Sequence, residues 1–195
     1  MLGRVSYARV IGLAMIALSV TQLADAAVVY GKAWLAPILI SRAYEESSDH
    51  DAPVKPWPWA DTHPVAKLAV PKHGIERFVL AGDSGHAMAF GAGMAGGVRP
   101  GEPGMVMISG HRDTHFRFLK RLEPEDAITL QSHGERFRYR VVSMTIADAK
   151  EGYMPIALPY QGLLLVTCYP FDELVPGGTA RYVVVAEREW EAERT

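Results

Sequence analysis

The chain has 195 residues, which is enough for one domain with a substantial core and one further segment. Its formal net charge of −2 leaves no excess of basic residues to hold a phosphate backbone, so nucleic acid is excluded as a partner. The only cysteine, Cys168, cannot form a disulfide within the chain and is expected to be a free thiol.

The N-terminal residues predict a membrane anchor. Arg4 and Arg9 precede an apolar run, and the stretch Tyr7–Leu23 is just long enough to cross a bilayer as a helix. Basic residues before such a segment favour a cytoplasmic N-terminus, with the rest of the chain across the membrane. Ala24-Asp25-Ala26 is also typical of a signal-peptide cleavage site, after which a mature chain would begin at Ala27. We expect the segment to be retained.

The composition divides the chain into four regions. Residues 1–44 are predicted to form the anchor and a juxtamembrane helix that kinks at Pro37. Residues 45–56 contain acidic residues, serines and prolines, and are predicted to form an exposed linker. Residues 57–190 are predicted to form the folded domain, and residues 191–195 a polar tail.

Eight short apolar or β-branched runs, separated by turn residues, follow Pro64. They predict a mainly β fold, a closed or nearly closed eight-stranded β-barrel with short helices. The glycine-rich stretch 91–97 is predicted to be a flexible turn, and Phe116–Leu122 a short helix. The predicted strands are Val65–Val70, Phe78–Leu80, Met88–Phe90, Met105–Ser109, Ala127–Gln131, Arg136–Ala147, Leu163–Cys168 and Tyr182–Ala186.

Three of the predicted strands carry a chemically useful residue at one end. Cys168 ends one run, His111 follows another after a glycine, and Arg181 begins a third. Taken alone, each has an ordinary structural interpretation, because a lone cysteine is usually an inert small apolar residue and the other two suit a solvated strand end. Taken together, they combine a nucleophile, a group that accepts and returns a proton near neutral pH, and a permanent positive charge.

These motifs resemble those of the sortases, the cysteine transpeptidases of bacterial surfaces, and in particular the branch found in proteobacteria. The segment His111-Arg112-Asp113-Thr114-His115-Phe116 is similar to the histidine motif of that branch. Leu165-Val166-Thr167-Cys168 is similar to the sortase pattern Leu-x-Thr-Cys, and Arg181-Tyr182-Val183-Val184 to the arginine strand. Pro56-Trp57-Pro58-Trp59-Ala60-Asp61 resembles the entry to the domain, so the resemblance covers roughly Trp57–Glu187.

The resemblance implies a sortase-like barrel and a two-step acyl transfer. It gives the catalytic roles to Cys168, His111 and Arg181, and an oxyanion-stabilising or substrate-positioning role to Thr167. Asp113, Thr114 and His115 are expected to support His111. It implies no cofactor and no metal. Val98, Met105, Met107, Tyr169, Phe171 and Val175 are candidates for lining a peptide groove, with ordinary core packing as the alternative.

The resemblance also implies partners and a location. The expected substrate is a secreted protein with a C-terminal sorting signal of the Leu-Pro-x-Thr-Gly kind, and the second substrate is an amine acceptor. The expected location is the inner membrane, crossed once, with the N-terminus in the cytoplasm and the catalytic domain in the periplasm.

Two other functions fit parts of the sequence. His111 and His115 have the spacing of two zinc ligands, but only if the segment is helical, and the glutamate that a metalloprotease uses as its base is replaced by Arg112. The other alternative is a membrane-tethered β-barrel that binds a partner without catalysis and leaves Cys168 inert.

Overall fold

The computed structural model describes residues 7–50, 52–151, 160–173 and 177–190. Arg4 and the predicted polar tail, 191–195, lie outside the described residues. The chain separates into two compact units, Met1–Ile38 and Leu39–Thr195.

The first unit consists of the N-terminal part of helix α1 (Tyr7–His50). Within it, Arg9–Ala27 has a mean hydropathy of 1.7, and none of this stretch is buried. At 1.5 Å of rise per residue, such a helix is about 28 Å long, close to the thickness of a bilayer's hydrocarbon core. By length and composition this segment can cross a membrane, although an N-terminal signal sequence would have the same properties.

Helix α1 continues through Pro37 to His50, so residues 45–50 are helical where the sequence predicts a linker. The reason lies in the second unit, where Ile40, Ala43 and Tyr44 are buried. Ile40 packs against Leu80 in a small apolar cluster, and the Tyr44 hydroxyl donates to the Gln131 carbonyl oxygen at 3.0 Å. Burial of one helical face outweighs the polar composition of this segment.

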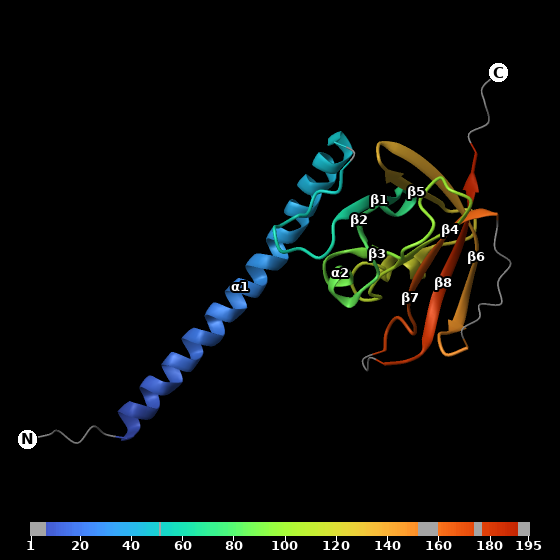
Figure 1. Cartoon of the computed structure of the whole chain (residues 1–195). Helices are drawn as coiled ribbons and strands as arrows, with labels where there is room; N and C mark the ends of the chain where they lie inside the picture. The colour runs from blue at the N-terminus through green and yellow to red at the C-terminus, as the bar shows by residue number, and fades with distance from the viewer. Residues whose placement is uncertain (1–6, 51, 152–159, 174–176, 191–195) are drawn as a thin grey trace, which may run out of the picture. The chain divides into compact units, whose positions relative to one another are not determined.

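The second unit is built around a closed barrel of eight strands in the order β1-β2-β3-β4-β7-β8-β6-β5, shown in Figure 1. The prediction of a mainly β, closed eight-stranded barrel is confirmed. The strands are β1 (Pro64–Val70), β2 (Ile75–Ala81), β3 (Ala92–Met94), β4 (Gly104–Ser109), β5 (Ala127–Ser132), β6 (Glu135–Asp148), β7 (Gln161–Cys168) and β8 (Ala180–Glu189).

Short helices connect some of these strands. They are η1 (Pro71–His73), α2 (Gly85–Phe90) and η2 (Arg117–Arg121). The last confirms the predicted short helix over Phe116–Leu122.

The third predicted strand, Met88–Phe90, is wrong because these residues end helix α2. The Ser84 hydroxyl accepts a hydrogen bond from the Ala87 amide at 3.3 Å and caps the start of this helix. The strand lies instead in the stretch predicted to be a flexible turn. A Cβ on Gly93 would lie 2.4 Å from the Gly82 carbonyl oxygen, so the glycine permits the close approach that β3 requires.

The barrel interior is filled by inward-facing side chains from most of the strands, among them Leu68, Ile108, Leu130, Leu163, Leu165 and Val184. A second apolar cluster lies on the opposite face of β7 and β8, with Leu164, Val183 and Val185 buried and Met107 packed against them. Strand β7 is therefore apolar on both faces, which is why it appears as a continuous run in the sequence.

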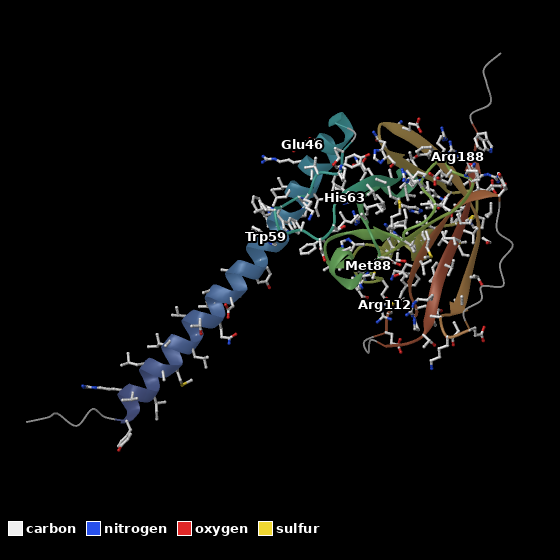
Figure 2. All side chains as sticks on the ribbon, viewed as in Figure 1. Glu46, Trp59, His63, Met88, Arg112 and Arg188 are labelled. Atoms are coloured by element: carbon white, nitrogen blue, oxygen red, sulfur yellow. The ribbon has the colours of Figure 1, made fainter. Side chains whose placement is uncertain are left out.

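The two ends of the barrel differ. Arg188 and Arg112 mark opposite ends in Figure 2. At the end near Arg188, the guanidinium carbon lies 4.5 Å from the ring centre of Phe137 and 4.9 Å from that of Trp190. A cavity of about 720 Å³ also opens at this end, between the β3–β4 loop and the β5–β6 turn. The end near Arg112 holds Cys168.

Candidate active site

Strand pairing places Cys168 opposite Arg181 and next to the end of β4, which His111 follows by two residues. Strand β7 runs parallel to β4, with Val166 opposite Ser109, and each strand reaches its reactive residue two positions later. On its other edge β7 runs antiparallel to β8, and Cys168 is paired directly with Arg181. Residues from three separate sequence motifs therefore meet at one end of three adjacent strands.

The Cys168 and Arg181 side chains share a face of the sheet. Successive residues of a strand alternate between faces, so Cys168 lies on the same face as Leu164, the outer face of the barrel. Arg181 shares this face with Val183, two positions further along β8. His111 follows β4 by two residues and is exposed.

The exposure of the three residues suits a site at the surface. Cys168 is free and partly buried, and His111 is exposed. The Arg181 side chain bends back toward the chain before β8, where Nη1 donates to the Gly178 and Ala180 carbonyl oxygens at 2.9 and 3.0 Å. These bonds fold the guanidinium back onto the backbone at the start of β8.

Backbone and side-chain bonds fix the ends of β4 and β7 to each other. The Gly110 amide donates to the Val166 carbonyl oxygen at 3.1 Å, and the Thr167 hydroxyl donates to the Gly110 carbonyl oxygen at 2.7 Å. Thr167 is 3% exposed and faces the barrel interior. A Cβ on Gly110 would lie 2.9 Å from the Phe116 ring, so the glycine before His111 allows this buried ring to pack over the backbone.

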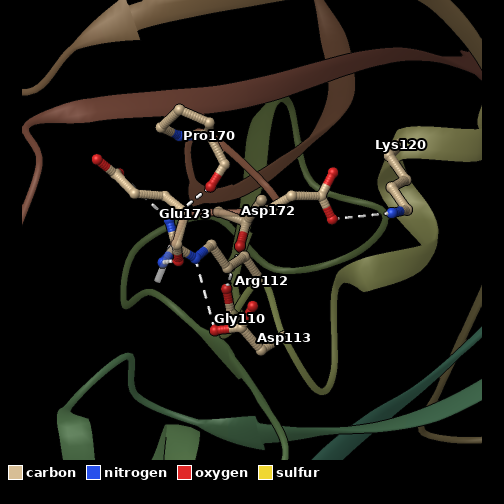
Figure 3. A network of polar contacts seen from close by, with 8 residues as sticks. Gly110, Arg112, Asp113, Lys120, Pro170, Asp172 and Glu173 are labelled. Carbon is tan, nitrogen blue, oxygen red and sulfur yellow. Dashed lines mark hydrogen bonds and ion pairs between the residues drawn. The ribbon is translucent and has the colours of Figure 1, made fainter. Parts of the chain in front are cut away.

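Arg112 is a residue that sequence reasoning missed. It is 8% exposed, and its two terminal nitrogens donate to the carbonyl oxygens of Pro170 and Glu173, as Figure 3 shows. Its Nε lies 3.5 Å from the Asp113 carboxylate. The sequence shows only a charge next to a histidine, and nothing in its spacing reveals that the charge is buried.

The segment after His111 forms turns. The Phe116 amide donates to the His111 carbonyl oxygen at 3.0 Å, and residues 112–115 are not helical. His115 is half-buried, and burial lowers the pKa of its imidazole, with the charges of Arg77 and His111 acting in the same direction. His111 and His115 therefore lack the helical geometry that the zinc hypothesis requires. Thr114 is exposed.

The candidate groove residues separate into two groups. Met105 and Met107 pack against the outer apolar cluster, on the face that carries Cys168. Val98 and Phe171 instead pack against the barrel core. Tyr169 stacks on Tyr182, with ring centres 6.2 Å apart, and burial together with the neighbouring Tyr169 raises the pKa of Tyr182. Val175 lies outside the described residues.

The sortase domain family model matches residues 68–189 of the chain, and the chain belongs to this family. Sortase D of Bacillus subtilis (strain 168) is 35% identical over 125 residues, which make up 62% of this chain and 62% of that protein. The chain thus matches about three fifths of the length of this curated relative.

Solved sortase structures share the fold. Sortase A from Corynebacterium diphtheriae superposes with a TM-score of 0.59 at 21% identity, covering 70% of this chain and 66% of that chain. A Clostridium perfringens Sortase D5 transpeptidase superposes with a TM-score of 0.61 at 17% identity, covering 80% of this chain and 99% of that chain. At this level of identity the likeness shows a common fold.

We predict that Thr167→Val lowers stability and weakens the site. Valine keeps the volume but removes the donor to Gly110, and loss of a buried hydrogen bond costs about 1–3 kcal/mol of the free energy of unfolding. Urea denaturation measures the stability, and the rate of Cys168 alkylation reports on the site. Thr167→Ser, which keeps the hydroxyl, is the control and is expected to stay closer to the parent. A valine variant as stable as the parent would show that this bond contributes nothing.

Proposed function

We propose that the protein is a membrane-anchored cysteine transpeptidase. It cleaves a C-terminal sorting signal of the Leu-Pro-x-Thr-Gly kind through a thioacyl-enzyme intermediate and transfers the acyl group to an amine. The observation that supports this proposal is the position of Cys168 at the end of β7, paired with Arg181 in β8 and neighbouring the end of β4, which His111 follows by two residues. Membership of the sortase family supports it.

The first half of the reaction forms a thioester. The Cys168 sulfur attacks the carbonyl carbon of the Thr-Gly bond as a thiolate, and His111 holds the thiol proton. The tetrahedral intermediate collapses with cleavage of the C–N bond, and His111 donates its proton to the departing glycine nitrogen. In the second half, an acceptor amine attacks the thioester, loses a proton to His111 and releases the Cys168 sulfur.

Arg181 stabilises the negative charge that develops on the carbonyl oxygen. Its guanidinium is positively charged at every relevant pH and carries five N–H donors in a fixed plane. The bonds from Nη1 to Gly178 and Ala180 keep the guanidinium at the start of β8, the strand end that is paired with Cys168. A donor kept at this strand end before substrate arrives is suited to stabilise the charge.

The remaining residues position the catalytic groups and the substrate. Thr167 acts through its bond to Gly110, which keeps the ends of β4 and β7 together. Asp113 and His115 support the turn that carries His111. Met105 and Met107 offer an apolar surface on the face of the thiol, along which the substrate peptide binds.

The helix Arg9–Ala27 anchors the enzyme as a single span of the inner membrane, with the N-terminus in the cytoplasm and the catalytic domain in the periplasm. The apolar length of this helix and the arginines at its start support this arrangement. A secreted substrate held at the same membrane meets the enzyme at a raised effective concentration. The histidine motif His111–Phe116 supports placement in the proteobacterial branch.

We predict that Cys168→Ala abolishes peptide cleavage and transfer and leaves the fold intact. The substitution removes one sulfur atom from a partly buried strand end. Intact-mass analysis of the protein mixed with a library of sorting peptides should trap an acyl adduct on the parent and none on the variant. Turnover by the variant would contradict the transpeptidase. A native thiol that no alkylating reagent modifies would instead favour a tethered β-barrel that binds a partner without catalysis.

Arg181→Lys tests the oxyanion role. Lysine keeps the charge but concentrates its donors on one nitrogen, so turnover should fall about a hundredfold, as with other removed oxyanion donors. Steady-state kinetics with a fluorogenic sorting peptide measures the loss. A lysine variant with parental turnover would mean that Arg181 supplies only a general positive field.

The anchor is tested by the mass of the protein extracted from membranes. If the membrane span is retained, the measured mass is that of the full chain, and this is the result we expect. A mature chain beginning at Ala27 would show that the segment is a cleaved signal, and would leave the assignment of Cys168, His111 and Arg181 unaffected.

A further inference from the structure

We propose that Arg112 is a positioning residue that sets the geometry between His111 and Cys168. Its guanidinium joins the segment that carries the imidazole to the loop that follows the thiol, as seen in Figure 3. The kinetic part of this inference rests on the proposed transpeptidase function. The part of the inference that is tested by alkylation requires only that the Cys168 thiol reacts with an alkylating reagent.

The first step is the burial of the charge. The Arg112 side chain is 9% exposed, while the neighbouring Asp113 side chain is 70% exposed. A buried guanidinium is costly unless its donors are bonded. Arg112 meets this requirement with two carbonyl oxygens, one on each terminal nitrogen, and with the Glu173 carboxylate at 3.7 Å from Nη1.

The second step is the origin of the acceptors. Pro170 and Glu173 both belong to the connection between β7 and β8, just after Cys168. Arg112 directly follows His111 in the chain. One side chain therefore joins the two segments just after the reacting residues by charge-assisted hydrogen bonds, which are stronger than neutral ones.

The third step is the arrangement of the bonds along the two segments. Before the reacting pair, the β4 and β7 ends are joined by the Gly110–Val166 and Gly110–Thr167 bonds. After it, they are joined by Arg112. His111 and Cys168 thus lie between two cross-links that connect the same two segments. Loss of the second cross-link would leave the imidazole and the thiol held from one side only.

A second contact of the same loop provides a matched control. Lys120 Nζ lies 3.3 Å from Asp172 Oδ1, with side chains 36% and 80% exposed. Surface ion pairs of this kind contribute about 0–1 kcal/mol. Lys120→Ala removes a charge that contacts the β7–β8 loop without touching the cross-link.

The chemical test is a double-mutant cycle on the full-length protein. The rate of Cys168 alkylation by iodoacetamide is measured across pH for the parent, Arg112→Ala, His111→Ala and the double variant. If Arg112 acts through the His111–Cys168 pair, Arg112→Ala slows alkylation in the parent and adds no further loss in the His111→Ala background. Equal losses in both backgrounds would overturn the proposal. Lys120→Ala should alkylate at the parental rate.

The kinetic test uses the sorting peptide. Arg112→Ala should lower kcat about a hundredfold with KM nearly unchanged, because a displacement of about 1 Å in a reacting pair has that effect. Arg112→Lys keeps a buried charge and most of the volume, so it provides the measurement if the alanine variant does not fold. It should lose activity too, since one nitrogen replaces two separated donors. A fully active Arg112→Lys variant would overturn the proposal.

The two proposals fail in different ways. If the parent forms no acyl-enzyme with any sorting peptide but the alkylation cycle shows coupling, the transpeptidase function is wrong and the role of Arg112 stands. If the parent forms the acyl-enzyme and the cycle shows no coupling, the function stands and the role of Arg112 is wrong.

Discussion

Strand β7 is hydrogen-bonded to β4 on one edge and to β8 on the other, and the positions of the reactive groups depend on this pairing. Because β4 is parallel to β7, the second residue after its C-terminal end, His111, corresponds in register to Cys168. Because β8 is antiparallel, its first residues lie at that level too. Cys168, Arg181 and the segment that carries His111, which come from distant parts of the sequence, are therefore brought to one end of the barrel by strand pairing alone.

The apolar residues of β7 do not by themselves determine its register, and a buried hydrogen bond does. Leu163, Leu164 and Leu165 are buried on alternating faces, so the hydrophobic pattern alone would tolerate a shift of one residue. Such a shift would move Cys168 to the inner face and Thr167 to the outer face. The bond from Thr167 to Gly110 exists only in the observed register. A buried polar contact here specifies the register that the apolar residues leave open.

Much of the fold could be predicted from alternation and turn residues, which are local. Seven of the eight predicted strands overlap strands of the structure, and the closed barrel is confirmed. The failures have tertiary causes. Met88–Phe90 is apolar enough for a strand, but the Ser84 cap starts a helix there. Strand β3 contains Gly93, where only a glycine leaves room for the Gly82 backbone. Strand propensity disfavours glycine and cannot detect this tertiary contact.

For the site, the three motifs and their order indicated which residues to consider, while the contacts among them came only with the structure. Arg112 shows why. Its partners are carbonyl oxygens of Pro170 and Glu173, and every residue type has a carbonyl oxygen, so no sequence pattern marks the acceptors. Helix α1 shows the complementary case, in which burial of Ile40 and Tyr44 extends a helix into a polar stretch.

The parallel pairing of β4 with β7 has a consequence for the order of folding. Gly110 and Thr167 are 57 residues apart in the chain, and a parallel pair cannot form from a tight turn. The hairpin of β7 and β8 can bring Cys168 next to Arg181 locally, whereas His111 joins them only after a long loop has closed. The pairing of β7 with β8 can therefore form first, and His111 reaches the end of β7 only as the barrel closes.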